Sequence, residues 1–362
     1  MILALALFGC GGTAEFGTIE GLGYEWVFFN HRLSYLQADV APASDTGGRE
    51  GQFAVVGGTS TTGVAPDLEP TCNPDECGEF PVHDSANVRL DAAFLVASGI
   101  RSGTGSVDLE AGSEGASGTA TIDLVGAKGS VAVAIAGLTF DTNHLTADAI
   151  EHCYDPAFGW HPTRIAVALG EPTLDGDTVT VDVTASFAAG NSLEDERKCV
   201  DEINEQAVAA IHVVVAAVAG NDVTVTTQDL TQGAEYAAGN VPFTPDPQPD
   251  PDPATRALTL DTTDAVLGWT KLDYTFHAGD PDGRGGYLRS VQIDADAATG
   301  LASGHANNYS PGTQLSGFVY DFAGTVEAIA VPGAAITRAS YTAELPAALD
   351  DGGVPVVTTF PL

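Results

Sequence analysis

Alternating apolar and polar residues beside a tight turn constrain the fold of this chain more than any other feature. Residues 178–184 read Thr-Val-Thr-Val-Asp-Val-Thr, and Asp175-Gly176-Asp177 come directly before them. A period of two places the valines on one face of a strand and the polar side chains on the other. Because Asp-Gly is a strong signal for a hairpin turn, the sequence predicts an antiparallel hairpin between Arg164–Leu169 and Thr178–Phe187.

Short apolar or alternating segments separated by turn residues recur along the rest of the chain, so we predict an all-β fold. A second hairpin is expected between Ile211–Val218 and Asp222–Leu230, with Gly220-Asn221 at its turn. One segment, Ser192–Ala207, carries helix signals, because Ser192 suits the N-cap and acidic residues fill the first turn. Acidic, glycine-rich stretches at 41–51 and 110–118 are predicted to be surface loops. Further strands are expected at Glu25–Asn30, Leu33–Val40, Val88–Ala97, Thr270–His277, Tyr287–Asp294, Gln314–Asp321, Gly324–Ala330 and Ile336–Ala343.

A proline-rich segment interrupts this pattern. Residues 244–253 read Thr-Pro-Asp-Pro-Gln-Pro-Asp-Pro-Asp-Pro, which excludes both helix and sheet and favours polyproline II. At about 3.1 Å per residue such a segment is a semi-rigid spacer roughly 30 Å long. We therefore predict two antiparallel β-sandwich-like domains, residues 22–243 and 257–362, joined by a Pro/Asp-rich linker at 244–256. The strand spacing of the second domain fits an immunoglobulin-like or jelly-roll sandwich.

The first residues indicate an exported protein. The chain begins Met-Ile-Leu-Ala-Leu-Ala-Leu-Phe-Gly-Cys, an apolar run that is too short to span a membrane but suits a secretion signal. The end of this run, Leu7-Phe8-Gly9-Cys10, resembles the lipobox of bacterial lipoproteins. An ordinary signal peptide and a buried N-terminal strand are the alternatives.

The lipoprotein resemblance implies where the protein is located rather than what it does. It implies that residues 1–9 are a signal peptide, that Cys10 becomes an acylated N-terminus held in a lipid bilayer, and that residues 10–21 form a tether. Gly11 after the cysteine implies export to the outer membrane or cell surface of a bacterial cell envelope.

The remaining cysteines are even in number, which in an exported chain indicates disulfides. Three pairings are open. A small loop closed by Cys72 and Cys77 would leave Cys153 to pair with Cys199, a bridge worth roughly 4 kcal/mol on the chain-entropy model. A zinc site is the rival, but the Cys-x-x-Cys pairs typical of zinc ribbons are absent from the sequence.

The net charge of the chain argues against nucleic-acid binding, and the excess of carboxylates has two explanations. The sequence has 49 Asp and Glu against 13 Lys and Arg, a formal net charge of −36. Nucleic-acid binding needs clustered basic residues, so nucleic acid is not an expected partner. The carboxylates either form a solvated surface suited to salty surroundings or include ordered Ca²⁺ ligands.

Residues 141–161 are the first candidate for chemistry. They contain His144, His152 and His161 among carboxylates, and imidazole suits Zn²⁺ or Cu²⁺. Tyr154 and Trp160 in the same stretch could instead form an aromatic platform for a sugar ring. A purely structural role, covering a neighbouring disulfide, is the third reading.

Residues 279–286 are the second candidate. They read Gly-Asp-Pro-Asp-Gly-Arg-Gly-Gly, in which Asp280 and Asp282 resemble the start of a calcium loop. Arg284 stands where a third oxygen ligand would be expected, and no glutamate closes the loop at the EF-hand distance. A hairpin turn stabilised by the aspartates is the alternative.

No common local enzyme signature is present in the sequence: there is no G-x-S-x-G, HExxH, P-loop, dinucleotide or EF-hand motif. Two hypotheses follow. The favoured one is an acidic surface lipoprotein with a non-enzymatic binding or structural role, whose ligand is an extracellular glycan or protein. The alternative is an extracytoplasmic metal-binding protein or hydrolase that uses the 141–161 region.

Overall fold

A computed structural model describes eleven stretches of the chain and shows an all-β fold, as predicted. Within these stretches every regular element is a strand. The described residues contain no helix that is long and apolar enough to cross a membrane. The stretches are residues 15–20, 32–37, 49–63, 85–141, 160–191, 208–235, 255–278, 285–294, 298–307, 318–346 and 357–361.

The strands run antiparallel in three sheets. In chain order they are β1 (Glu15–Glu20), β2 (Arg32–Gln37), β3 (Arg49–Gly63), β4 (Ser85–Ala111), β5 (Ala116–Asp123), β6 (Ser130–Asp141), β7 (Trp160–Leu169), β8 (Thr173–Asp175), β9 (Thr178–Asn191), β10 (Ala209–Gly220), β11 (Thr224–Glu235), β12 (Thr255–Ala257), β13 (Ala265–Ala278), β14 (Gly285–Asp294), β15 (Thr299–Asn307), β16 (Phe318–Ala330), β17 (Ala335–Pro346) and β18 (Val357–Pro361).

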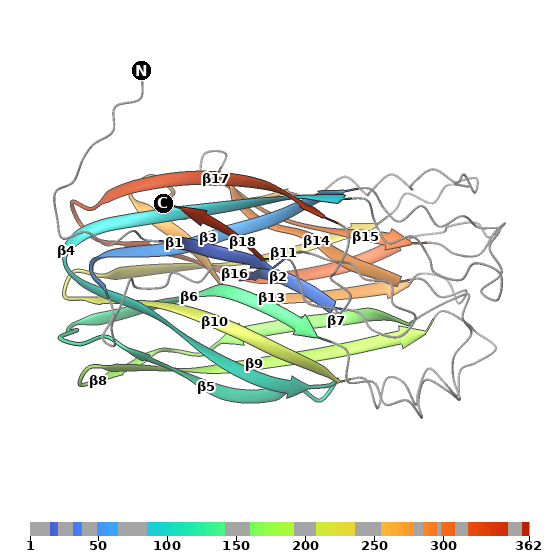
Figure 1. Cartoon of the computed structure of the whole chain (residues 1–362), viewed down its shortest axis with the longest axis horizontal. Coiled ribbons are helices and arrows are strands. Elements are labelled where there is room, and N and C mark those ends of the chain that lie inside the picture. The colour runs from blue at the N-terminus through green and yellow to red at the C-terminus, as the bar shows by residue number, and fades with distance from the viewer. Residues whose placement is uncertain are drawn as a thin grey trace, which may run out of the picture.

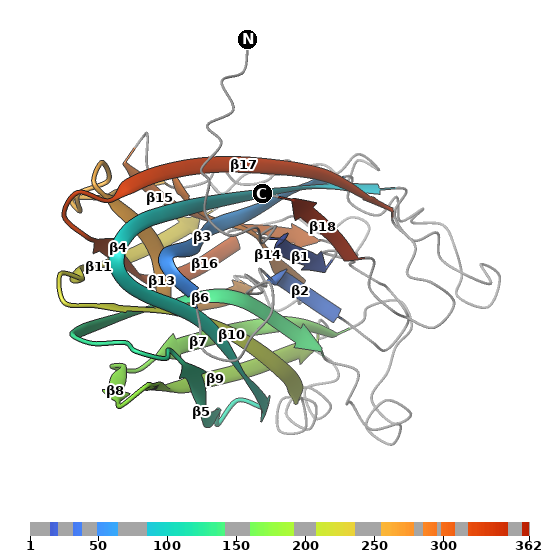
Figure 2. The same cartoon turned by 60° about the vertical axis from the view of Figure 1, so that its left-hand side comes forward.

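Two large sheets form the body (Figure 1). A nine-stranded sheet has the order β12-β15-β14-β3-β4-β10-β6-β2, with β17 also paired to β4. A seven-stranded sheet has the order β11-β16-β13-β7-β9-β5, with β8 paired to β9. The long strand β4 arches through the body and pairs with β3 and β17 in its first half and with β10 in its second (Figure 2). The third sheet is a ribbon of β1 and β18, so the two ends of the described chain are paired.

The first predicted hairpin is confirmed. Strands β7 and β9 pair antiparallel, and the short strand β8 pairs with the start of β9 across the Asp175-Gly176-Asp177 turn. Gly176 has φ of 62°, the left-handed conformation that glycine adopts without strain. Val179, Val181 and Val183 are fully buried, while Asp182 is exposed. Each buried valine stabilises the strand by about 1.5 to 3 kcal/mol, which is why its register holds.

The second predicted hairpin has the expected strands but the wrong pairing. Strand β10 ends at Gly220 and β11 begins at Thr224, as the turn signal indicated. However, β10 pairs with β4 and β6, whereas β11 pairs with β16, so the chain passes from one sheet to the other at this turn. Burial explains the difference, because β10 is buried on both faces over Val213–Gly220 and therefore lies in the middle of the molecule.

The strands do not divide at the predicted linker. Strands on both sides of residues 244–256 share both large sheets: β13 pairs with β7, β16 with β11, β14 with β3 and β17 with β4. Residues 22–243 and 257–362 therefore do not form two independent sandwiches. The reason is that β7, β11 and the first half of β4 need neighbours that only the second part of the chain supplies.

Smaller expectations also differ from the structure. The loop expected at 110–118 is a short turn between β4 and β5. Phe318–Asp321, the described part of the strand expected at 314–321, and Gly324–Ala330 belong to one strand, β16. Strands β1, β3, β5, β6, β12, β15 and β18 were not among the predicted strands. The predicted helix at 192–207 and the predicted strand at 25–30 lie outside the described residues.

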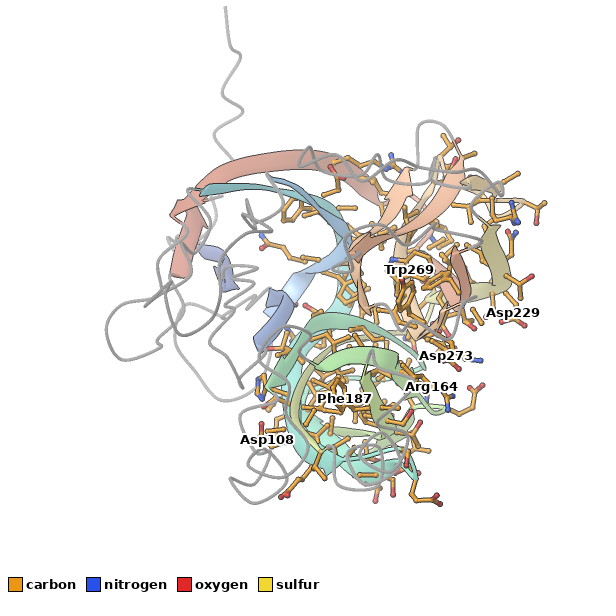
Figure 3. The ribbon with its side chains drawn as sticks, turned by 90° about the vertical axis from the view of Figure 1, so that its right-hand side faces the viewer. Asp108, Arg164, Phe187, Asp229, Trp269 and Asp273 are labelled. Carbon is orange, nitrogen blue, oxygen red and sulfur yellow. The ribbon has the colours of Figure 1, made fainter. Side chains whose placement is uncertain are left out.

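The core lies on both sides of β10. On one face, Val213, Val215 and Ala217 pack into a large cluster with Phe187 of β9 and Leu267 of β13. On the other face, Val214, Ala216 and Val218 join a second cluster with Phe53 and Val55 of β3. Figure 3 looks along the strands, with Phe187 inside the lower part of the body and Trp269 inside the upper part.

Glycine permits the closest approaches between the sheets. A side chain at Gly105 of β4 would meet the backbone carbonyl of Thr121 in β5. A Cβ at Gly268 of β13 would lie 2.6 Å from the Cβ of Ala134 in β6. Next to this contact the buried indole Nε1 of Trp269 donates a hydrogen bond to the carbonyl of Gly57 in β3 over 3.1 Å. The contacts of Gly268 and Trp269 hold the second part of the chain against the first.

Candidate functional site

The two ends of the body differ in how the chain turns. At one end, here called the turn end, tight turns at 124–129, 176–177, 220–223 and 331–334 join the strands, and β4 bends at Gly99. At the other, here called the connection end, lie the strand ends that flank longer connections (Figure 1). These connections are residues 64–84, 142–159, 192–207, 236–254, 279–284 and 308–317.

Strand register shows that these strand ends lie together. In the nine-stranded sheet, Ala209 at the start of β10 pairs with Ala111 at the end of β4, and Ala210 pairs with Asp141 at the end of β6. In the seven-stranded sheet, Trp160 at the start of β7 pairs with Asn191 at the end of β9. The amide of Phe187 donates to the carbonyl of Gly112 over 3.1 Å and links the two groups across the sheets.

Most of the predicted site residues fall in these connections and lie outside the described residues. These are His144, His152, Tyr154, Cys72, Cys77, Cys153, Cys199, Asp280 and Asp282; Cys10 also lies outside them. The disulfides, the lipidated cysteine and the convergence of the three histidines therefore stay predictions.

Two predicted residues stand in a described strand. Trp160 and His161 are the first residues of β7, where His161 pairs with Gly190 of β9. Both therefore lie at the connection end, on the seven-stranded sheet. They directly follow the connection 142–159, which carries the other two histidines of the predicted metal site.

The alternative expectation for residues 279–286, a hairpin turn, is wrong. Strand β13, which ends at Ala278, belongs to the seven-stranded sheet, and β14, which begins at Gly285, belongs to the nine-stranded sheet. The chain therefore crosses between the sheets here. Whether Asp280 and Asp282 bind Ca²⁺ stays a prediction.

A histidine–carboxylate pair lies on the nine-stranded sheet near the connection end. Ile211 and Val213 point into the core, so His212 faces outward from β10. Its Nδ1 lies 2.6 Å from Oδ1 of Asp108 in β4, the residue directly opposite it. The His212 side chain is 32% exposed and that of Asp108 is 86% exposed. A carboxylate in this position orients the imidazole ring and fixes its tautomer.

This pair escaped sequence reasoning because it depends on register. Asp108 and His212 are separated by 104 positions, and only the pairing of β4 with β10 brings them together. Alternation along β10 indicates an outward histidine, but nothing local names its partner. The described residues hold no group of three or more His, Cys, Asp or Glu side chains that could bind a metal ion.

An ion pair lies on the outer face of the seven-stranded sheet. Arg164 of β7 donates through Nε and Nη2 to the two carboxylate oxygens of Asp273 in β13, each over 3.1 Å. This hydrogen bonding raises the pKa of the Arg164 guanidinium above its usual value, against the smaller effect of burial. In Figure 3 this pair lies on the opposite side of the body from Asp108.

A half-buried carboxylate lies on the seven-stranded sheet near the turn end. Glu327 of β16 stands opposite Gly268 of β13 and Thr227 of β11. Burial raises its pKa to about 7, and the negative charge of Glu171 adds to the effect. This residue is therefore a source of pH dependence in the stability of the fold.

Comparison with known proteins adds no candidate function. No family model matches this chain, and no match was found among curated proteins or solved structures.

Proposed function

We propose that this chain is an exported, acidic surface lipoprotein with a non-enzymatic binding or structural role, whose ligand is a glycan or a protein. Its anchor is a lipid bilayer, reached through acylated Cys10, in the outer membrane or at the surface of a bacterial cell envelope. The lipobox-like run Leu7-Phe8-Gly9-Cys10 and the net charge of −36 support this location.

One observation carries the binding role. The connections with the predicted aromatic, histidine and cysteine residues begin and end at one end of a rigid two-sheet body, the connection end. A rigid scaffold that presents its longer connections on one side is a common arrangement for ligand binding. The aromatic residues Tyr154 and Trp160 suit the face of a sugar ring.

Membrane fractionation tests the proposed membrane anchoring. Replacement of Cys10 by Ala should move the protein from the membrane fraction to the soluble fraction, because acyl chains provide the anchor. A protein that stays with the membrane in the C10A variant contradicts lipidation.

A glycan array tests the ligand. The full-length C10A protein should bind a saturable glycan, and the Trp160→Ala and Tyr154→Ala variants should lose at least tenfold in affinity. Thr180→Ala, at the turn end, is the matched control and should bind as the parent does. Equal binding by all variants, or no saturable ligand, contradicts a glycan-binding connection end.

The second candidate function is metal binding or metal-assisted hydrolysis through His144, His152 and His161. The position of His161 at the start of β7 favours it, since the connection 142–159 reaches the body at that point. Stoichiometric Zn²⁺ or Cu²⁺ after gentle purification, lost in the triple alanine variant, would support it. Protein that is free of metal and binds none on addition would reject it.

A further inference from the structure

The strand nearest to the proposed lipid anchor belongs to a small sheet of its own. Strand β1 (Glu15–Glu20) pairs antiparallel with β18 (Val357–Pro361) at five positions. Neither strand pairs with any other described strand, so the two form an isolated ribbon. The β1–β18 ribbon lies against the body next to β2 (Figure 2).

The ribbon begins inside the segment that the sequence predicts to be the lipid tether, residues 10–21. Residues 15–20 of that segment are a strand rather than a linker. Only four residues, Gly11 to Ala14, stand between Cys10 and Glu15. Even in the most extended chain, the five Cα-to-Cα steps from Cys10 to Glu15 span at most about 18 Å. While β1 is paired, an acylated Cys10 would therefore keep the ribbon within about 18 Å of the lipid.

Strand β18 is what ties this short tether to the body. It follows β17 along the chain, and β17 pairs with β4 over twelve positions. Strand β1 lies beside β2 but does not pair with it. Without β18, β1 would lose its one backbone partner among the described strands, and a strand whose amides and carbonyls have no partner strand exchanges its hydrogen bonds with water.

Loss of this pairing would lengthen the tether severalfold. The next described strand is β2, which begins at Arg32, opposite Asp141 of β6. The 22 Cα-to-Cα steps from Cys10 to Arg32 reach at most about 75 Å. As a flexible chain they have an average end-to-end distance on the order of 26 Å, against about 12 Å for the five steps to Glu15.

The ribbon can open while the body stays folded. Both large sheets are formed without β1 or β18, and β2 keeps its own pairing with β6. A two-stranded ribbon that joins no larger sheet is marginally stable in water. Opening of the ribbon therefore costs little compared with unfolding of the body.

From this arrangement we propose that β18 is a clasp that sets how far the body stands from a lipid bilayer. Paired with β1, it holds the body close to the lipid surface. Released, it lets the body stand further out on a longer tether. The inference rests on the proposed acylation of Cys10 and adds to it a control of the distance between the body and the membrane.

Neutron reflectometry on a supported phosphatidylcholine bilayer tests the clasp, because it measures the height of the protein layer. The acylated full-length protein is compared with the double variant Thr358→Pro/Thr359→Pro. Neighbouring residues of a strand point their amides to opposite edges, so one of the two prolines removes a hydrogen bond to β1 in either phase of the ladder. The double variant Thr358→Val/Thr359→Val keeps both amides and is the matched control.

The proline variant should form a layer further from the bilayer than the parent by on the order of 10 to 15 Å, and the valine variant should stay at the parent's height. All three should show the same cooperative unfolding in urea, because both large sheets are formed without β18. Equal heights for the proline variant and the parent overturn the proposal. A proline variant whose body fails to fold also overturns it, since β18 would then be part of the body and not a clasp.

These two failures differ from a failure of the proposed lipoprotein function. In both of them the parent stays on the bilayer and the C10A protein does not. A parent that does not bind the bilayer contradicts the acylation of Cys10, and the clasp is then rejected together with it.

Discussion

The turn end and the connection end of the body place different demands on the sequence. At the turn end, glycines with positive φ stand at Gly126, Gly129, Gly176 and Gly333, and short backbone hydrogen bonds close the turns. At the connection end, a single described turn, 112–115, joins two strands directly, and longer connections hold most of the predicted site residues. We therefore expect substitutions at the turn end to affect stability most, and those at the connection end to affect the proposed binding role.

The largest expected effect is at the turn end. Gly129 has φ of 88°, and a Cβ there would run into the carbonyl of Gly220. Gly129→Ala combines backbone strain with a clash against backbone that cannot move, so it should lower the free energy of unfolding by about 2 to 4 kcal/mol. Urea denaturation of the purified protein measures this.

Gly176→Ala is the matched control for this substitution. Gly176 also has a positive φ, 62°, but a Cβ there would meet nothing within 4 Å. Its cost should be about 1 kcal/mol, from strain alone. Equal losses at the two glycines would show that the close approach of Gly129 to Gly220 does not matter for stability.

Glu327 should make the stability of the fold depend on pH. Its pKa is raised from 4.5 to about 7 in the folded protein, so the folded state holds the proton more tightly than the unfolded state does. The stabilising contribution is complete below about pH 4.5 and is lost as the pH rises through 7. Relative to Glu327→Gln, the parent should lose about 1 to 2 kcal/mol between pH 4.5 and pH 8, less than the full shift implies because water screens a half-buried group.

Urea unfolding of both proteins across this pH range measures the effect. Their free energies should converge below about pH 4.5, where Glu327 is neutral like glutamine, diverge between about pH 4.5 and pH 7, and differ by a constant amount above that. Parallel curves for the two proteins would contradict the raised pKa.

A smaller effect is expected for the ion pair near the connection end. Arg164→Ala removes two charge-assisted hydrogen bonds to Asp273, but the arginine side chain is 44% exposed. The loss should be about 0.5 to 1 kcal/mol and should shrink in 1 M salt. A loss above 2 kcal/mol would mean that the connection end contributes to stability as the turn end does.

The smallest effect is expected within the connection end. Alanine at His144, His152 and His161 together should change the free energy of unfolding by less than about 0.5 kcal/mol in metal-free protein. The same variant should lose any bound Zn²⁺ or Cu²⁺, measured by elemental analysis. A large loss of stability without metal would show that these histidines are structural.

The local sequence pattern predicted where strands occur better than it predicted which strands pair with each other. The β7–β9 hairpin follows from valines at every second position and an Asp-Gly turn, so both its strands and their pairing were predictable. The turn at Gly220-Asn221 has an equally good signal, yet it leads from one sheet to the other. A tight turn reverses the chain in either case. The burial of β10 on both faces, which depends on distant residues, decides which strands become partners.

The candidate site was predictable only in part for the same reason. Local sequence located the histidines and aromatics of 142–161, and the start of β7 places Trp160 and His161 at the connection end. The pair of His212 and Asp108 could not be found in this way, because it depends on the register of two strands far apart in the chain. Metal and disulfide predictions on the other connections stay predictions.

The sequence by itself determined that the chain folds into strands, where its tight turns stand, and that its surface is strongly acidic. These properties follow from alternation, glycine and charge, which act over a few residues. The tertiary structure decided that the parts before and after the proline-rich run share two sheets. It did so because strand edges are satisfied by whichever partner buries the most apolar surface, and the strands that complete β7 and β11 come from beyond residue 254.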